Sequence, residues 1–444
     1  MKPRDVALML AIFLIALWQH LALLDVTPFN PDESRWLHRA HYPREVWQPS
    51  SSTWDDGYLN RGQPPLGSYA MGIGLLAQGR DLTTNGSWVF TCQEGVCRDD
   101  FDESIFNRAN GNVPAAADLD AGRRTNAVIG ALTAVAMYAL GKRLTTRVGA
   151  VAAASILAAH PFQAYISSLA TADALFSWLL VLAALAAAGF AARPRWPGAI
   201  LLGVMLGLGG ATKLSPLVTA VAPAGLGVVL IGWSWWRARA WPDRYALGLV
   251  AAPLVALLTF VAVYPYLWPD PIDRTVALFT FRAREMQTQG SDWPSLAVPT
   301  RTEAFRQVGF TLGTRWDATR RAGEAGLARL GIDASLPTLD LPLALIGLEV
   351  LLVLAVRRGL RSPTMLVLLL LGGQVAITIA GMRAAFDRYH VPMVLLVALC
   401  AGVLVGQTSA GVRQVIDRLG AWRGAAPRPI PNRIGVRLRQ VGAR

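Results

Sequence analysis

The sequence predicts an all-α polytopic membrane protein, and three observations lead to this fold class. Of the 444 residues, 53% are hydrophobic, and the mean hydropathy of +0.37 is too high for a soluble chain of this length. The apolar residues fall into long runs, and about 20 such residues suffice for a helix to cross a bilayer. Two long polar segments separate groups of these runs, which predicts a membrane bundle with two large loops.

Ten apolar runs define the predicted membrane-spanning helices. The first run is longer than the apolar region of a signal peptide and precedes no small-residue cleavage site, so it counts as a span. The fifth is short and is separated from the sixth by Thr-Lys-Leu-Ser-Pro, which predicts a kinked or tilted helix. The predicted spans are residues 6–24, 124–141, 148–166, 172–192, 198–211, 214–232, 245–266, 339–356, 364–381 and 390–408.

Short basic segments set the predicted orientation of these spans. The formal net charge of +13 comes mainly from arginine, and in a soluble protein it would indicate nucleic-acid binding. With ten spans, however, all basic segments fall on one side of the membrane, which the positive-inside rule makes cytoplasmic. We therefore expect a cell-membrane protein with both termini in the cytoplasm and no nucleic-acid partner. The basic segments are Lys2 with Arg4, 141–147, 193–196, 237–244, 357–362 and the tail from Arg413 to Arg444.

This topology divides the chain into six parts. Both long loops contain amphipathic stretches, at 64–77, 270–287 and 316–332, which are predicted to form helices along the membrane surface. The parts are a first transmembrane helix (1–24), an extracytoplasmic loop with the catalytic residues (25–123), transmembrane helices 2–7 (124–265), a second extracytoplasmic loop (266–338), transmembrane helices 8–10 (339–408) and a basic cytoplasmic tail (409–444).

The three cysteines and two of the histidines have structural interpretations. Cys400 lies inside an apolar run and is predicted to be a packed, inert thiol. Cys92 and Cys97 lie in the polar sequence Thr-Cys-Gln-Glu-Gly-Val-Cys-Arg, where an extracytoplasmic location predicts a local disulfide. A metal site there is disfavoured, because no further ligands are spaced nearby. His160 and His390 also lack a second ligand nearby and are predicted to be structural.

Two adjacent carboxylates, Asp32 and Glu33, follow the first span in the sequence Asn-Pro-Asp-Glu-Ser-Arg-Trp. A carboxylate at the membrane surface, partly withdrawn from water, can act as a general base on an acceptor hydroxyl. The alternative is a helix N-terminus in which Asn30 or Asp32 is the capping residue and Glu33 lies in the first turn. Taken alone, the pair favours the cap.

The rest of the first loop favours the catalytic interpretation. A second acidic pair, Asp55 and Asp56, precedes the turn Gln63-Pro64-Pro65-Leu66-Gly67, whose two prolines fix their backbone angles. Each pattern is weakly specific, but the carboxylate pair, a spacer of about 30 residues and the rigid turn are distinctive together. We expect Asp55, Asp56 and Gln63 to lie in a substrate cavity.

Further short motifs occur along the chain, each on the side of the membrane that the predicted topology requires. They are an Arg-led second span beginning Gly-Arg-Arg-Thr at 122–125, Pro161 in the third span, Asp173 before the fourth, Thr212-Lys213 after the fifth and Arg388-Tyr389 before the last. With Asp32-Glu33 and the 63–67 turn, this order resembles the lipid-carrier-dependent glycosyltransferases of family 39. That family includes the protein O-mannosyltransferases and the lipid A aminoarabinose transferases. The resemblance covers about residues 5–232 well and the later chain loosely.

The resemblance implies a GT-C-like helical bundle in which Asp32 is the catalytic base, beside Glu33, and Asp173 supports the site. Asp173 lies next to a span, where an ionisable group is costly and usually functional; the alternative is a cap of the fourth helix behind Thr171. The chain departs from the family at Gln63, in place of His or Lys, and at Gly62, where some members carry a metal-binding Glu. We therefore predict no required cofactor, with a divalent metal as the alternative.

The donor's phosphate requires a cationic cradle. A sugar on polyprenyl phosphate leaves with that phosphate, and arginine or lysine near the membrane surface stabilises its growing charge. The candidates are Arg124, Lys213, Arg282, Arg284 and Arg388. Tyr389 is expected in the substrate cavity beside them. As alternatives, Lys213 is an interfacial anchor, and Arg282 with Arg284 forms the solvated face of a surface helix.

The predicted function is an inverting glycosyl transfer on the extracytoplasmic face of the membrane. Asp32 removes a proton from the acceptor hydroxyl or amine, the acceptor attacks the anomeric carbon, and polyprenyl phosphate leaves. The expected partners are a polyprenyl-phosphate-linked hexose or pentose, a protein, glycan or lipid acceptor, and membrane lipids. The alternative is a transporter or flippase of lipid-linked sugars, which needs acids near the bilayer midplane, whereas here they concentrate in the loops. In a third interpretation, a non-catalytic membrane partner, Asp32→Asn would change nothing.

Overall fold

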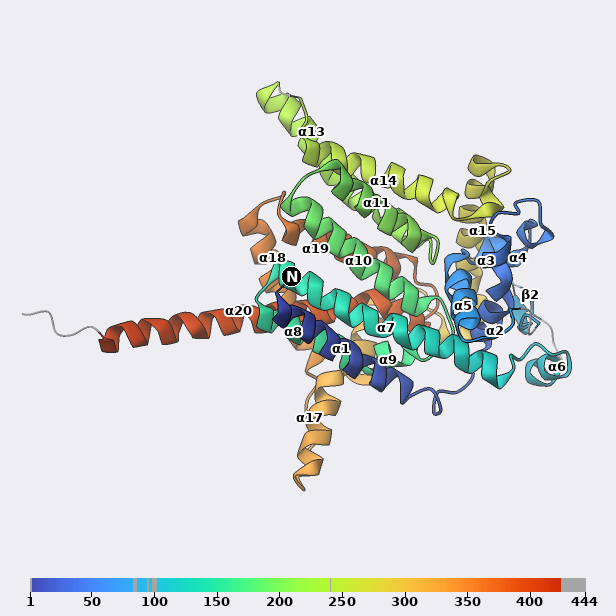
Figure 1. Ribbon diagram of the computed structural model, residues 1–444, viewed down its shortest axis with the longest axis horizontal. Coiled ribbons are helices and arrows are strands. Elements are labelled where there is room, and N and C mark those ends of the chain that lie inside the picture. Colours follow the sequence, from blue (N-terminus) through green and yellow to red (C-terminus); the bar gives the residue numbers. More distant parts are fainter. Residues whose placement is uncertain (1, 83–85, 94–95, 98–101, 240, 425–444) are drawn as a thin grey trace, which may run out of the picture.

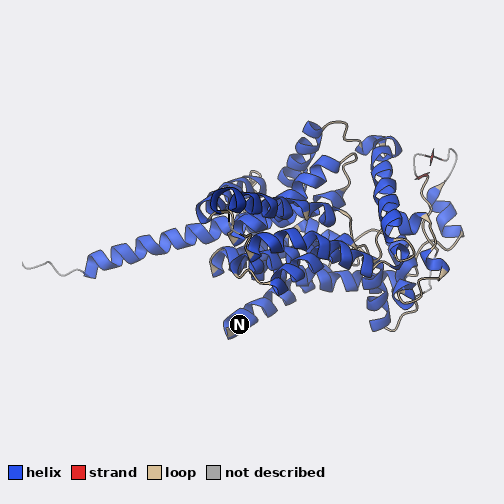
Figure 2. Ribbon diagram, turned by 90° about the horizontal axis from the view of Figure 1, so that it is seen from above, coloured by secondary structure: helices blue, strands red, loops and turns tan. Residues whose placement is uncertain are grey.

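The computed structural model shows a bundle of helices, as Figures 1 and 2 display. It describes residues 2–82, 86–93, 96–97, 102–239 and 241–424, and within these the β-structure is one short hairpin and an isolated bridge. The all-α membrane fold class predicted from the sequence is confirmed. The last part of the predicted cytoplasmic tail, beyond residue 424, lies outside the described residues.

Seven helical segments of the described chain are long and apolar enough to cross a membrane, which confirms a multi-pass membrane protein. Apolar helices suit the bilayer because all their backbone hydrogen bonds are internal. The segments are α1 (Pro3–Leu21), α7 (Ala116–Leu144), α10 (Asp173–Ala192), α12 (Ser215–Thr219) with α13 (Val221–Ala238), α14 (Arg244–Ala262), α19 (Pro363–Gly381) and α20 (Val391–Gly424) with the preceding turn η6 (Asp387–His390).

The other three predicted spans also coincide with helices, but these are broken, short or charged. Helix α8 (Arg147–Ala159) bends by 60° into α9 (Pro161–Ser167), and the pair would make an eighth span. The bend falls where Pro161 cannot donate a backbone hydrogen bond, and His160 caps the new helix instead. Helix α11 (Trp196–Gly210) has 15 residues, and α18 (Asp340–Arg358) carries acidic and basic residues along its length.

Small residues let the membrane helices approach closely. Gly207 of α11 faces α14 so tightly that an added Cβ would lie 2.4 Å from the carbonyl oxygen of Ala256. Gly402 of α20 meets Ala153 of α8 in the same way, at 2.4 Å. Van der Waals contact at such positions holds membrane helices together, since lipid offers no hydrophobic drive for their association.

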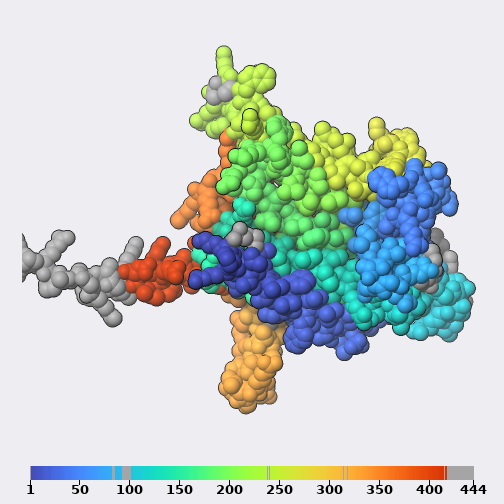
Figure 3. All heavy atoms as spheres, viewed as in Figure 1, coloured from blue at the N-terminus to red at the C-terminus, as the bar shows by residue number. Residues whose placement is uncertain are grey.

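One end of the bundle, which we call the loop-rich end, carries most of the short elements. Figure 3 shows the first loop, in blue, covering this end as a continuous surface. The elements of the two long loops are α2 (Pro31–His38), η1 (Arg39–His41), α3 (Tyr42–Glu45), η2 (Ser52–Trp54), α4 (Tyr58–Gly62), α5 (Leu66–Ala77), β1 (Cys92–Gln93), β2 (Val96–Cys97), α6 (Glu103–Ala109), η3 (Pro265–Leu267), α15 (Pro271–Asp292), η4 (Pro294–Leu296), α16 (Arg301–Phe310), the π-turn η5 (Thr311–Arg315) and α17 (Ala318–Arg329).

The opposite end holds the N-terminus and the long extension of α20 (Figure 1). There Asp5 of α1 accepts hydrogen bonds from Tyr138 at 2.7 Å, Lys142 at 2.9 Å and Arg147 at 3.0 Å, which ties three helices together. The three amphipathic stretches of the loops are helical, as α5, α15 and α17. Their location at the membrane surface stays a prediction.

The cysteines follow the predicted division. Cys92 is disulfide-bonded, and its backbone pairs with that of Cys97 across the β1–β2 hairpin. Cys400 is free and buried in the core, against Gly347 of α18.

Candidate active site

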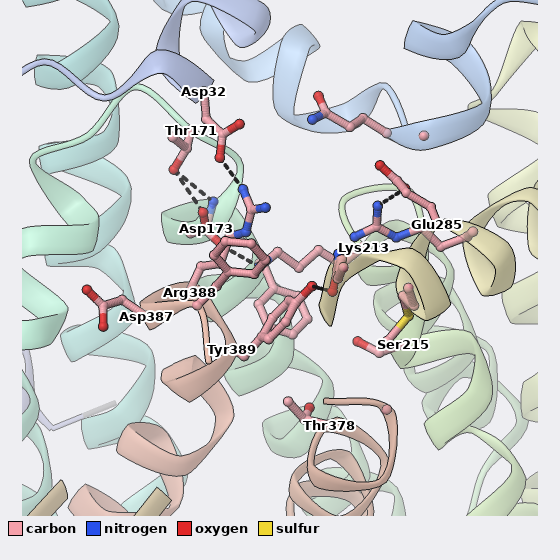
Figure 4. A pocket seen from close by; sticks show the side chains of 18 of the residues that line it. Asp32, Thr171, Asp173, Lys213, Ser215, Glu285, Thr378, Asp387, Arg388 and Tyr389 are labelled. Atoms are coloured by element: carbon pink, nitrogen blue, oxygen red, sulfur yellow. Dashed lines mark hydrogen bonds and ion pairs between the residues drawn. The ribbon is translucent and has the colours of Figure 1, made fainter. Parts of the chain in front are cut away.

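A cavity of about 730 Å³ opens at the loop-rich end, where loops and membrane helices meet. Its wall combines α2, α4 and the 90–92 segment from the first loop with α15 from the second. The ends of α10, α12, α19 and η6 complete it. Residues from distant parts of the chain therefore share one open cavity (Figure 4).

Helix α2 directs its two adjacent carboxylates to different places. Pro31 begins the helix, Asn30 caps it by accepting from the Asp32 N–H at 3.0 Å, and Glu33 accepts from the Asn30 N–H at 2.9 Å. This capping box is the helix-terminus alternative of the sequence analysis, with Asn30 as the cap. The side chain of Asp32 is not used by the cap and lines the cavity.

Glu33, predicted as a catalytic residue, lies outside the cavity and is fully buried. Its carboxylate accepts two hydrogen bonds from Arg123 and one from the Ala170 N–H, all at 2.8 Å. Arg123 also donates to the carbonyl oxygens of Thr27 at 2.9 Å and Pro28 at 3.0 Å. The pair thus joins the α1–α2 linker, α7 and the α9–α10 linker, and so it positions both Asp32 and Asp173.

Asp173 and Lys213 form an ion pair at the cavity wall (Figure 4). The hydroxyl of Thr171 donates to the other oxygen of Asp173 at 3.0 Å, and the ammonium of Lys213 lies 5.1 Å from the ring centroid of Phe176. Helix α10 begins at Asp173 with no side-chain cap, so the capping alternative does not account for this carboxylate. Lys213 contacts the acid, which its interpretation as an interfacial anchor does not require.

Arg388 binds Asp32 across the cavity, although the two residues are 356 positions apart in the sequence (Figure 4). Its guanidinium also lies 5.0 Å from the ring centroid of Phe386. The neighbouring Tyr389 donates its hydroxyl to Gln289 of α15 at 3.0 Å. Turn η6 therefore brings a cation and a phenol, both predicted from the sequence, into the cavity.

Helix α15 supplies a further charged pair, Arg282 and Glu285, one turn apart on the cavity face. Glu285 accepts from the hydroxyl of Tyr58 at 2.8 Å, and Tyr58 accepts from Arg35 at 3.1 Å. Burial and the negative charge of Glu285 raise the pKa of Tyr58 to about 12. The phenol therefore stays protonated at neutral pH and remains a hydrogen-bond donor.

Several cavity residues were not singled out from the sequence. Arg35 lies one turn after Asp32 on α2, so helical periodicity could have identified it. Arg315 and Asp387 pair at 2.7 Å and also line the cavity. Asp387 directly precedes the Arg-Tyr motif, which was a usable signal, whereas Arg315 comes from the π-turn η5 and had none.

Four further predicted site residues do not reach the cavity, which corrects their placement. Arg124 is exposed on α7 and pairs with Asp120 at 2.5 Å; one residue of helix turns a side chain by about 100°, so it faces away from Arg123. Arg284 points outward for the same reason, two residues after Arg282.

The acidic pair of the first loop is likewise outside. Asp55 is exposed, and Asp56 accepts from Arg61 at 2.5 Å and from Tyr266 at 2.7 Å. Gln63 does line the cavity, and its side-chain oxygen accepts from the buried Arg39 at 2.8 Å. Arg39 thereby fixes the Pro64-Pro65 turn to η1, which directly follows α2.

No three His, Cys, Asp or Glu side chains gather as a metal site among the residues that the structure describes. At Gly62, the position where the resemblance implies a metal-binding Glu in some family members, an added Cβ would lie 3.6 Å from the rings of both Tyr58 and Phe281. His160 and His390 make local contacts, to the Phe162 N–H at 3.2 Å and the Asp387 carbonyl at 3.1 Å. Independence from a cofactor stays a prediction.

Comparison with known proteins agrees with the predicted resemblance. Residues 116–266 match the family described as dolichyl-phosphate-mannose-protein mannosyltransferase. No curated protein matches the sequence. The predicted resemblance to the protein O-mannosyltransferases is therefore confirmed over this part of the chain.

Two solved structures share the fold at low sequence identity. One is ArnT from Cupriavidus metallidurans bound to undecaprenyl phosphate, with a TM-score of 0.50 and 14% identity, covering 96% of this chain and 64% of that one. The other is the Archaeoglobus fulgidus oligosaccharyltransferase in complex with Zn and sulfate, with a TM-score of 0.50 and 14% identity, covering 94% and 52%. The chain thus spans about half to two thirds of the length of these proteins, and they define its fold as GT-C.

Proposed function

We propose that the protein is an inverting glycosyltransferase that moves a sugar from a polyprenyl-phosphate donor to an acceptor at the extracytoplasmic face of a membrane. The observation that carries this proposal is the pairing of two carboxylates with two cations in one cavity. Asp32 with Arg388 and Asp173 with Lys213 supply both a base and a phosphate cradle. Sugar transfer from a lipid-linked donor needs both: a base for the acceptor hydroxyl and cations for the donor phosphate.

The chemistry is a single displacement. Asp32 takes the proton of an acceptor hydroxyl, and the acceptor oxygen forms a bond to the anomeric carbon from the face opposite the phosphate. The bond from that carbon to the phosphate oxygen breaks, and its electron pair leaves with polyprenyl phosphate. Lys213, Arg388 and Arg282 stabilise the charge that develops there. Because phosphate is already a good leaving group, the reaction requires no general acid.

The apolar part of the cavity supports a lipid-linked donor. Leu214 and Val218, which follow Lys213 along the chain, line the same cavity as Ile377. A phosphate held by the lysine would therefore have its hydrocarbon chain beside membrane helices. The matched family description names a dolichyl-phosphate sugar donor, and the ArnT structure contains undecaprenyl phosphate. We extend this donor class to the present chain, for hexoses and pentoses alike.

The test uses purified protein in which Asp32 is intact or replaced by Asn. Both are incubated with a panel of polyprenyl-phosphate sugars, with membrane extract as the source of protein, glycan and lipid acceptors. We expect the wild type alone to release polyprenyl phosphate and to transfer one sugar of the panel to one acceptor class. The enzymatic proposal would be falsified if the wild type used no donor while both proteins bound lipid-linked sugar equally well. That result would point to transport.

A further inference from the structure

The charges that line the cavity balance one another. Five are acidic and five are basic, and four of the five cations are ion-paired with a lining carboxylate. The fifth, Arg35, donates to the Trp88 carbonyl at 3.2 Å and to Tyr58 at 3.1 Å. The pairs are Asp32–Arg388, Asp173–Lys213, Glu285–Arg282 and Asp387–Arg315. An incoming phosphate that binds any of these four cations must therefore take it away from a carboxylate.

We infer that donor phosphate takes over Arg388 and Lys213 from Asp32 and Asp173, so that binding of the donor releases the base and must precede activation of the acceptor. This inference rests on the proposed function. It assigns Arg388 two successive partners: Asp32 in the donor-free site, where the pair masks the base, and the phosphate once the donor has bound.

The geometry selects these two cations over the others. An entering phosphate can contact all four paired cations, since their side chains keep between 25% and 55% of their exposure; what separates them is the carboxylate that each one holds. Arg282 instead pairs with Glu285 within its own helix, and Tyr58 holds Glu285 from the other side. Arg315 pairs with Asp387, which is not proposed to take part in the reaction.

The exchange of partners is favourable for the cations and for the released base. A phosphate diester keeps one negative charge and two free oxygens, which an arginine fork or a lysine ammonium binds as well as it binds a carboxylate. A carboxylate that has lost its cation has both oxygens open to a hydrogen bond from the acceptor hydroxyl, which is the geometry that a general base needs. Without donor, Arg388 holds one oxygen of Asp32, and an acceptor hydroxyl that approaches this oxygen has to displace the guanidinium.

The inference is tested by equilibrium binding of undecaprenyl phosphate to the full-length protein in detergent, without acceptor. We expect Asp32→Asn to bind it roughly tenfold more tightly than wild type, because Arg388 no longer has to leave a carboxylate. Asp173→Asn should tighten binding through Lys213 in the same direction. Arg388→Gln should weaken binding, and in the double variant Asp32→Asn/Arg388→Gln the gain from removing Asp32 should disappear.

The matched control is Asp120→Asn, which removes the carboxylate partner of Arg124 outside the cavity and should leave the affinity unchanged. If wild type binds undecaprenyl phosphate but Asp32→Asn and Asp173→Asn bind it no more tightly, the exchange is overturned while the proposed function stands. An equal gain in Asp120→Asn also overturns it, as a general charge effect. If neither wild type nor any variant binds the phosphate, the proposed donor class fails, and the inference fails with it.

Discussion

The two faces of α2 hold chemically identical groups in opposite surroundings. On one face Asp32 lines a cavity and meets Arg388 with 20% of its side chain exposed. On the other face Glu33 has no exposure and is surrounded by four hydrogen bonds from Arg123, Ala170 and Asn30. The role of a carboxylate therefore follows its environment, since one residue of helical rotation separates a reactive position from a structural one.

Replacing Glu33 should have the largest effect on the free energy of unfolding. In Glu33→Gln the guanidinium of Arg123 stays buried without a countercharge, and breaking such a pair costs about 3–5 kcal/mol. We expect a large drop in the thermal unfolding temperature of the purified protein, followed by tryptophan fluorescence in detergent.

The double variant Glu33→Gln/Arg123→Gln separates charge from shape. It removes both buried charges, so it should regain part of the lost stability. A Glu33→Gln protein that unfolds like wild type but does not transfer sugar would make Glu33 a catalytic residue, as the sequence first suggested, and would remove the contrast between the two faces.

Replacing Asp32 should have the largest effect on the reaction and little on stability. Loss of a general base lowers the turnover rate by about 10²–10⁴-fold, so Asp32→Asn should retain at most about one hundredth of the wild-type rate. Its unfolding temperature should match wild type, because Arg388 is partly exposed and remains hydrated. Sugar transfer and thermal unfolding measured on the same preparation check both statements; equal activity would show that the exposed face is no more reactive than the buried one.

Removing Lys213 should have a smaller effect that is confined to the donor. A charged hydrogen bond to a phosphate contributes about 1.5–3 kcal/mol, so Lys213→Gln should lower kcat/KM for the donor by roughly 10–150-fold. The KM for the acceptor should change little. Arg124→Gln is the control, since that arginine lies outside the cavity; a comparable loss there would return it to the phosphate site predicted from the sequence.

The sequence predicts the fold of this protein well, because span length and loop charge are local properties. It also predicts which motifs meet, since Asp32, Asp173, Lys213 and Arg388 all fall at the same end of their spans. Rotation about a helix axis is what it does not predict. The sequence pattern does not distinguish Asp32 from Glu33, or Arg123 from Arg124. The two residues of each pair differ only in what packs against their side of the helix.

Pairings between distant segments are beyond sequence analysis for a related reason. Asp32 and Arg388 lie in distant parts of the chain, and only the fold, which places η6 across the cavity from α2, brings them together. Arg315 belongs to a π-turn in an irregular part of the second loop, where no periodic signal indicates the direction of a side chain.

Breaking the disulfide at Cys92 should have a modest effect on the same cavity. A short closed loop contributes only about 2 kcal/mol of chain-entropy stabilisation. The segment is also held by Glu103, which accepts from the Thr91 N–H at 2.8 Å. We expect Cys92→Ser to lower transfer by no more than roughly fivefold, about 1 kcal/mol, because Phe90 keeps its place over Arg35 at 4.3 Å.

Reductant supplies the control for that change. Dithiothreitol should lower transfer by wild type to the level of Cys92→Ser and leave the variant itself unaffected. Equal sensitivity of both proteins would trace the effect to another part of the chain, and a complete loss of activity would mean that the hairpin, and not only α2, fixes the cavity face.

The smallest effect is expected at a third carboxylate, Asp56, which is exposed where Glu33 is buried and pairs with arginine as Glu33 does. The hydrogen bond from Arg61, and then that from Tyr266, hold the pKa of Asp56 below its ordinary value of 3.8. A lowered pKa stabilises the folded state at pH values above 3.8, and the contribution disappears as the pH falls through the folded-state pKa. Because the pair is half exposed, we expect Asp56→Asn to lose only a few tenths of a kcal/mol at pH 7.

The difference in unfolding temperature from wild type should be constant from pH 7 to 5 and vanish in more acidic buffer. Arg61→Gln should behave in the same way; a cost at Asp56 as large as that at Glu33 would show that burial is not what separates the structural carboxylate from the others.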